Sequence, residues 1–167
     1  MKALILFLLI LMQTDSFPLK NKKRDLADEN KSNDIVILHT NDVHCGVTDT
    51  IGYDGLMLYK KQLQKKYNNV LLVDAGDHIQ GGTIGLLTHG EAIIKIMNKL
   101  EYNVATVGNH EFDYKIAELE DRTKELNCGY ISINYCFNND TCRYDASKII
   151  EIGEKKLVLL EYLHLKL

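Results

Sequence analysis

The chain has 167 residues, 46% of them hydrophobic and 26% charged, which is typical of a folded globular protein and excludes a disordered one. This length predicts one domain with enough apolar material for a core. The net charge of -3 argues against a nucleic-acid polymer as partner, because proteins that bind DNA or RNA generally carry a basic face.

The N-terminal segment predicts export. Lys2 precedes an uninterrupted apolar run at residues 3–12, which suits the core of a signal peptide and is shorter than the ~20 apolar residues that span a bilayer. We therefore predict a signal peptide at 1–16, no stable membrane span, and a secreted (extracellular or periplasmic) protein. An uncleaved anchor is the alternative. Residues 17–33 are polar and charged and are predicted to form a linker.

From residue 34 onward, strand-like and helix-like segments alternate. Short β-branched or leucine-rich runs, typical of strands covered on both faces, occur at 34–40, 69–75, 103–107 and 129–134, and a further strand is predicted within 156–165. Apolar spacings of three and four predict helices at 55–67, 91–100 and 115–126, with Tyr59 and Ile116 among the residues expected on the buried faces. This alternation predicts an α/β domain at 34–167 with a parallel sheet.

Polar side chains follow three of the predicted strands directly. They are Asp42 and His44 after the first, Asp77 after the second, and Asn109, His110 and Asp113 after the third. The carboxyl ends of parallel strands meet at one sheet edge, where open α/β sheets bind ligands. Mixed oxygen and imidazole donors suit Zn²⁺, Mn²⁺ or Fe better than Ca²⁺. We predict a shared metal site there; ordinary loop polarity or helix capping is the alternative.

Four cysteines would meet an oxidising environment if the chain is exported. They are Cys45, Cys128, Cys136 and Cys142. Three pairings are open to four cysteines. The turn-like segment FNND between Cys136 and Cys142 makes that pair the favoured disulfide.

The segments HTNDVH, GDHIQGG and GNHEFDY, in this order and separation, resemble the metallophosphatase motifs D-x-H, G-D and G-N-H-E. ILHTNDVH together with GNHEFD resembles the secreted 5′-nucleotidases of the calcineurin-like superfamily, a group that includes UDP-sugar hydrolases and 2′,3′-cyclic-nucleotide phosphodiesterases. The resemblance implies the first half of a four-layer α/β/β/α sandwich. It also implies hydrolysis of phosphate esters of nucleotides by a water that two divalent metal ions, Zn, Mn or similar, activate.

The resemblance implies a role for each matching metal ligand. Asp42 and His44 match the pair that binds the first metal. Asp77 matches the carboxylate that bridges both metals, and Asn109 matches the amide ligand of the second.

His110 matches the catalytic histidine of the family, and Asp113 matches the carboxylate that orients it. Their spacing at the start of a helical pattern also places the two on one face; a structural hydrogen bond is the alternative. Glu111 matches a motif position without a direct metal role and is left out of the site. Among the other histidines, His39 is predicted to be buried on its strand and His78 to be structural.

The family pattern extends further than this sequence matches it. Relatives continue with two more histidine ligands and a nucleoside-binding domain, and the terminal LEYLHLKL does not match that continuation. The chain is therefore interpreted as an N-terminal portion that is inactive alone. A non-catalytic, truncated secreted module that binds metal or a partner is the alternative. Without the second half of the sandwich, we expect an exposed apolar sheet face that a partner chain would cover.

Overall fold

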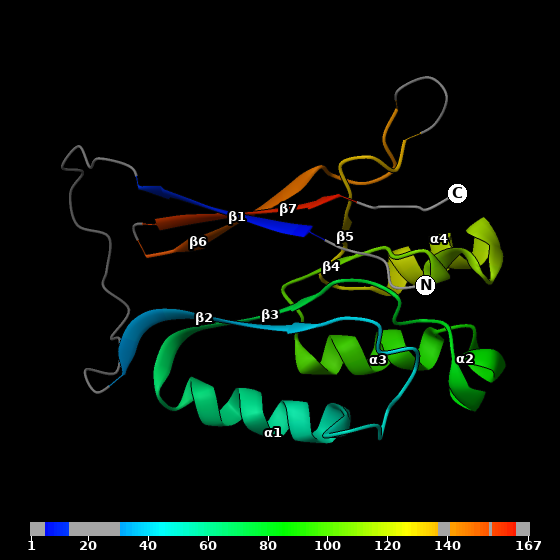
Figure 1. Ribbon diagram of the computed structural model, residues 1–167, viewed down its shortest axis with the longest axis horizontal. Coiled ribbons are helices and arrows are strands. Elements are labelled where there is room, and N and C mark those ends of the chain that lie inside the picture. Colours follow the sequence, from blue (N-terminus) through cyan, green and yellow to red (C-terminus); the bar gives the residue numbers. More distant parts are fainter. Residues whose placement is uncertain (1–5, 14–30, 137–140, 154, 163–167) are drawn as a thin grey trace.

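The computed structural model describes residues 6–13, 31–136, 141–153 and 155–162. Helices, a four-stranded sheet and a three-stranded sheet follow one another as layers (Figure 1). The helices are α1 (Gly52–Gln64), α2 (Gly82–Thr88), α3 (Glu91–Leu100), the short 3₁₀ helix η1 (His110–Phe112) and α4 (Lys115–Glu125). The strands are β1 (Leu6–Gln13), β2 (Ser32–Thr40), β3 (Tyr67–Asp74), β4 (Val104–Thr106), β5 (Tyr130–Ile131), β6 (Ser147–Ile152) and β7 (Lys155–Tyr162).

The four-stranded sheet has the order β2-β3-β4-β5, and all of its strand pairs are parallel. Leu38 pairs with Leu72, and Val73 pairs with Val104. Each of these strands coincides with a predicted apolar run, and helices connect β2 to β3, β3 to β4 and β4 to β5. The predicted α/β fold with a parallel sheet is therefore confirmed.

The inner strands of the parallel sheet are buried on both faces, to which the successive side chains of a strand point in turn. Leu72 of β3 packs with helix residues such as Ile94 and Met97. Its neighbours Leu71 and Val73 pack in a second cluster, which faces the other sheet. This two-sided burial explains why the strands read as continuous apolar runs.

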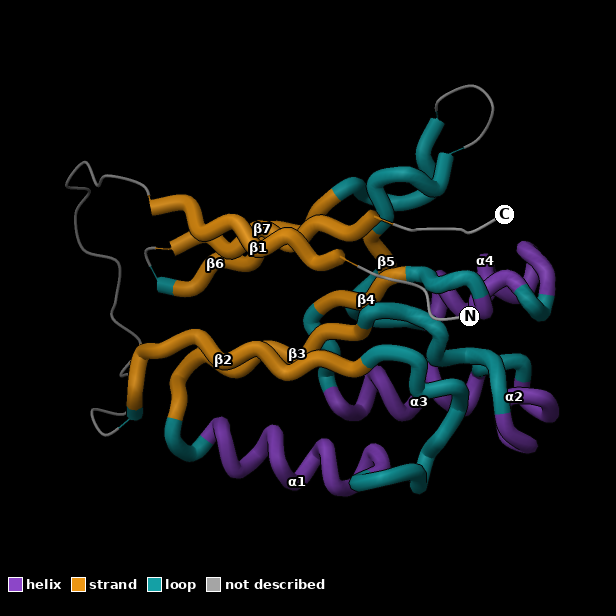
Figure 2. The backbone as a smooth tube through the Cα atoms, in the orientation of Figure 1, coloured by secondary structure: helices purple, strands orange, loops and turns teal. Residues whose placement is uncertain are grey.

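The second sheet has the order β1-β7-β6 and is antiparallel. It lies across the parallel sheet from the helices (Figure 2). Leu157 and Leu159 of β7 are each 1% exposed and pack in the same cluster as Val104 and Ile131. The expectation that this sheet face is open is therefore wrong where β7 covers it. Strand β6 was not predicted, although its partner β7 was.

The first helix differs from its prediction. It spans Gly52–Gln64, and Tyr67 belongs to β3. Tyr59 is 49% exposed, whereas Leu56 and Lys60 are buried. The Lys60 Nζ donates hydrogen bonds to the carbonyl oxygens of Leu100 and Glu101 at the end of α3. A lysine can therefore occupy the inner face because tertiary contacts satisfy its ammonium group.

Two other burial predictions are wrong. Ile116 is 52% exposed on α4, and His39 is exposed on β2. His39 alternates with Leu38, which contacts the helix-side core, so His39 points to the other face of the sheet. On that face Ile35 and Ile37 are only partly buried, because β2 is an edge strand.

The N-terminal apolar run contains β1, which pairs antiparallel with β7 from Leu6 opposite Tyr162 to Gln13 opposite Lys155. Removal of residues 1–16 by a signal peptidase stays a prediction. Most of the predicted linker, residues 17–33, lies outside the described ranges. Within those ranges no helix combines the length and the apolar character needed to cross a membrane.

Candidate metal centre

Two loops at the carboxyl edge of the parallel sheet run side by side. The backbone N–H of Asp42 donates to Gly76 O at 3.1 Å, and that of His44 donates to Asp77 O at 2.9 Å. Asp42, His44 and Asp77 adopt left-handed backbone conformations, with φ of 53°, 48° and 58°. A non-glycine residue pays about 1–2 kcal/mol for this conformation, and such residues concentrate at functional sites that hold them in place.

The side chains of these loops converge with one from the loop after β4. His44, Asp77 and His110 each offer a ligand atom, and these atoms lie within 4.8 Å of one another. The Asp42 Oδ1 lies 3.8 Å from the His44 Nε2. The structure therefore brings together four of the side chains that the sequence predicted at this sheet edge, from the loops that follow three strands. They are Asp42, His44, Asp77 and His110.

Electrostatic crowding characterises this cluster. Burial raises the pKa of Asp77 above its ordinary value, and the carboxyl groups of Glu111 and Asp42 raise it further, whereas the hydrogen bond from the His110 backbone N–H opposes the rise. That N–H lies 2.8 Å from Asp77 Oδ1. Crowded carboxylates next to imidazoles are the surroundings that a divalent cation stabilises.

The predicted pair His110 and Asp113 is present. The His110 Nδ1 lies 2.7 Å from the Asp113 Oδ2. This hydrogen bond raises the pKa of His110, although partial burial opposes the rise. The bond occupies Nδ1 and so leaves Nε2 for a ligand or substrate. The His110 ring also packs edge-on against His44, with ring centroids 4.9 Å apart.

Asn109 ends the loop after β4, directly before η1. It is partly buried, and its backbone carbonyl accepts a bond from the Phe112 N–H at 3.4 Å. Among the described residues its side chain makes no hydrogen bond, so the amide oxygen is available as a ligand.

A buried polar network lies beneath the cluster. His78 is fully buried, with Nδ1 2.7 Å from the Asp74 Oδ1 and Nε2 2.8 Å from the Tyr130 hydroxyl. Burial alone would lower the pKa of His78, but the carboxylates of Asp74 and Glu111 outweigh it and raise this pKa to about 9. The predicted structural role of His78 agrees with this burial.

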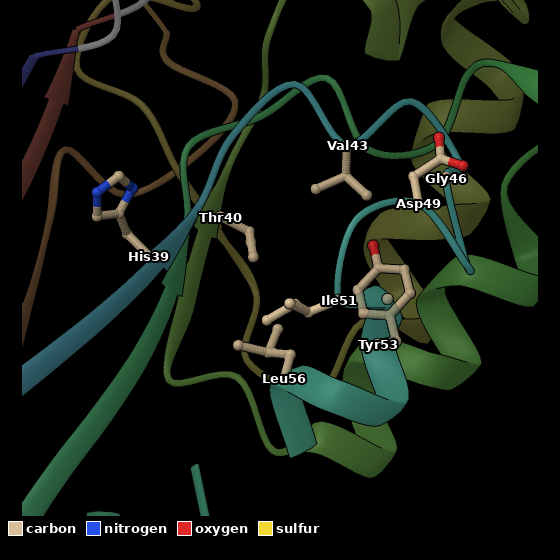
Figure 3. A pocket seen from close by; sticks show the side chains of 9 residues that line it. His39, Thr40, Val43, Gly46, Asp49, Ile51, Tyr53 and Leu56 are labelled. Carbon is tan, nitrogen blue, oxygen red and sulfur yellow. The ribbon is translucent and has the colours of Figure 1, made fainter. Parts of the chain in front are cut away.

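A cavity of about 190 Å³ lies between the end of β2, the loop that follows it and the start of α1 (Figure 3). It is lined by His39, Thr40, Val43, Gly46, Asp49, Ile51, Gly52, Tyr53 and Leu56. Neither Asp77 nor His110 lines it. The candidate metal cluster, in which His44 and His110 are partly buried and Asp77 is buried, is therefore separate from this cavity.

A sequence model of the family described as "Calcineurin-like phosphoesterase" matches residues 35–161. The chain belongs to the calcineurin-like phosphoesterase family. All six candidate site residues lie inside the matched range. The range also includes β3, β4 and β5 and all of β2 except its first three residues.

Relatives of this family include 5′-nucleotidases. The chain is 33% identical over 148 residues to a snake venom 5′-nucleotidase from Crotalus adamanteus, a match that covers 77% of this chain and 25% of that protein. It is 34% identical over 149 residues to the 5′-nucleotidase of Homo sapiens, covering 77% of this chain and 26% of that protein. The solved structure of Haemophilus influenzae NAD nucleotidase superimposes with a TM-score of 0.64 and 26% identity, covering 73% of this chain and 25% of that one. The chain thus spans about a quarter of the length of these relatives.

The disulfide favoured from the sequence is present, because Cys136 is bonded to Cys142. Cys45 and Cys128 are free thiols. Burial raises the pKa of Cys45 to about 11 and that of Cys128 to about 12. Both thiols are therefore protonated and unreactive near neutral pH.

Proposed function

We propose that the chain is the N-terminal portion of an exported, metal-dependent phosphoesterase of the 5′-nucleotidase type, which hydrolyses phosphate esters of nucleotides. The observation that supports this most directly is the donor cluster of His44, Asp77 and His110, whose ligand atoms lie within 4.8 Å of one another. It stands at the sheet edge where α/β proteins bind ligands. Relatives named 5′-nucleotidase match the chain across this region.

The donor set fits two divalent cations. Asp42 and His44 would hold the first, Asp77 would bridge both, and Asn109 would hold the second. Carboxylate, imidazole and amide donors suit Zn²⁺ or Mn²⁺. When bound, two such ions lower the pKa of a bound water and neutralise the charge on the phosphoryl oxygens.

The remaining chemistry belongs to side chains of this chain. Asp113 holds the His110 Nδ1 at 2.7 Å, which fixes the orientation of the imidazole and the position of its protons. The His110 Nε2 would then donate a hydrogen bond to a phosphoryl oxygen, where negative charge develops during the reaction. Asp113 is exposed, so the pair lies at the surface where substrate can reach it.

Activity is expected to need ligands beyond these. The family resemblance assigns two further histidine ligands to positions after β7, for which this sequence has no match. We therefore expect the 167-residue chain to release little phosphate from nucleoside 5′-monophosphates in Mn²⁺ or Zn²⁺. A version extended with the adjoining coding sequence should be active. Phosphate release measured with and without EDTA compares the two.

The outcomes separate the proposals. Robust EDTA-sensitive hydrolysis by the 167-residue chain would show that its own residues complete the site. An extended protein that binds Mn²⁺ without hydrolysing nucleotides would favour the alternative, a non-catalytic metal-binding module. An extended protein that binds no Mn²⁺ would refute a metal-dependent function of either kind.

Export is part of the proposal and rests on the N-terminal apolar run and on the disulfide between Cys136 and Cys142, which suits an oxidising compartment. We expect the intact mass of the protein recovered from a eukaryotic secretion host to lack residues 1–16. Retention of these residues in the secreted protein would instead support the uncleaved form. Alkylation of the denatured, unreduced protein is the control for the disulfide. Only the free thiols of Cys45 and Cys128 should react.

Removal of residues 1–16 would also remove β1 and leave one edge of β7 unpaired. An unpaired strand edge offers a row of backbone donors and acceptors to another strand. We propose this edge as the place where a partner chain, or a further segment of a longer chain, pairs with β7. Size-exclusion chromatography with light scattering of the mature protein tests self-pairing, which a monomer at all concentrations would exclude.

A further inference from the structure

Glu111 is a carboxylate buried within the motif that carries Asn109 and His110. It is 0% exposed. A buried carboxylate is costly unless it is paired or hydrogen-bonded. In this structure its hydrogen-bond donors are backbone N–H groups of the loop that carries Asp77 and of the loop that carries His110.

Four N–H groups donate to this carboxylate. Oε2 accepts from Asp77 at 2.8 Å and from Gly108 at 2.5 Å, and Oε1 accepts from His78 at 2.7 Å and from Ile79 at 3.2 Å. An ionised carboxylate has about four lone-pair sites. All four are used, so Glu111 has no direction left in which to bind a metal ion.

Three of the donors, at residues 77–79, are consecutive. Consecutive backbone N–H groups around a left-handed residue form a concave anion site, and Asp77 is that residue, with φ of 58°. The anion that fills the site belongs to the protein itself. The fourth donor, Gly108, ties the loop after β4 to the same carboxylate.

These bonds connect both halves of the metal centre. The loop at 77–79 carries Asp77, and its carbonyl oxygens in turn accept the N–H groups of His44 and Cys45. Glu111 itself lies in η1, one residue after His110. A shift of this single carboxylate would therefore move ligands from all three strands.

We propose that Glu111 is a positioning residue, which holds the ligands Asp77 and His44 and the catalytic His110 in their places by accepting the backbone N–H groups of residues 77–79 and 108. The inference rests on the proposed metal-binding function. It assigns a role to a residue to which the family resemblance gives no direct contact with metal.

Two substitutions separate geometry from charge. Glu111→Gln keeps the shape but turns one acceptor oxygen into a donor that faces two N–H groups. Glu111→Asp keeps the negative charge but is one methylene too short to reach all four donors. We expect both substitutions, made in the extended protein, to weaken Mn²⁺ binding by ~10–100-fold in calorimetry, as for other residues that orient metal ligands. If Glu111→Asp bound Mn²⁺ like the wild type, charge and not position would be the cause, and the proposal would fail.

Amide hydrogen exchange supplies a readout that needs no metal. In the wild type, the amides of Asp77, His78, Ile79 and Gly108 should be protected, and in Glu111→Gln they should exchange ~10–100-fold faster, because hydrogen bonds to a charged acceptor are lost. Met97→Ala, which truncates a fully buried core side chain of α3, is the control. It should lower the melting temperature while leaving Mn²⁺ affinity unchanged.

Each outcome decides one claim. Unprotected amides at these four positions in the wild type would overturn the proposal without any variant. Equal loss of Mn²⁺ affinity in Met97→Ala and Glu111→Gln would also overturn it, since general destabilisation would then suffice. An extended wild-type protein that binds no Mn²⁺ would defeat the proposed metal-dependent function, and the exchange data would still show whether Glu111 fixes the loops.

Discussion

His110→Ala in the extended protein is expected to lower nucleotide turnover by ~10²–10⁴-fold, the range for loss of an acid–base or charge-stabilising group, with bound metal unchanged. The reason is that His110 is anchored through Nδ1 to Asp113 at 2.7 Å and is free to act through Nε2. Asp113→Asn should produce a smaller loss, because Asp113 only orients the imidazole. Phosphate release measured together with metal content by elemental analysis checks both.

Asp77→Asn is the contrasting variant. It removes charge from the residue proposed to bridge both ions, so metal content should fall together with turnover. The donor atoms of His110 lie within 4.8 Å of those of His44 and Asp77, close enough for His110 itself to be a ligand. A metal-free His110→Ala protein would therefore place His110 among the ligands and remove its catalytic role.

Gly108→Ala should disrupt the metal centre without changing any ligand. A Cβ at this position would lie 2.2 Å from Asp77 Oδ1 and 2.7 Å from Asp77 Cγ. The carboxylate must move, and it then loses its bond from the His110 N–H. Displacements of about 1 Å cost enzymes ~10²-fold. We expect a loss of similar size in Mn²⁺ affinity, measured by calorimetry.

Gly129→Ala is the matched control. A Cβ there meets nothing within 4 Å, although the backbone has φ of +70°, so this variant carries backbone strain without a clash. It should lose about 1–2 kcal/mol of stability and keep its Mn²⁺ affinity. If Gly108→Ala bound Mn²⁺ with the affinity of the wild type, the position of the Asp77 carboxylate in the structure would not matter for metal binding.

The parallel sheet could be predicted from sequence because its inner strands are buried on both faces and so appear as apolar runs. The wrong predictions of burial for the first helix and for His39 have a common cause. Lys60 is buried because carbonyl groups at the end of α3 satisfy it, and His39 is exposed because β2 is an edge strand. Both depend on neighbours distant in sequence, which periodicity within one segment does not report.

The sequence by itself determined the alternation of the four parallel strands with helices, the family, and the positions of the polar residues that follow three of these strands. These are local properties, since side-chain spacing and motif residues are adjacent along the chain. Only the tertiary structure decided which of those residues meet, and that Glu111 lies buried between two loops with its four acceptor sites filled. The sequence of the motif is the same whether its glutamate faces water or backbone amides. The difference is the desolvation of its carboxylate, which arises only when β3 and β4 are brought side by side.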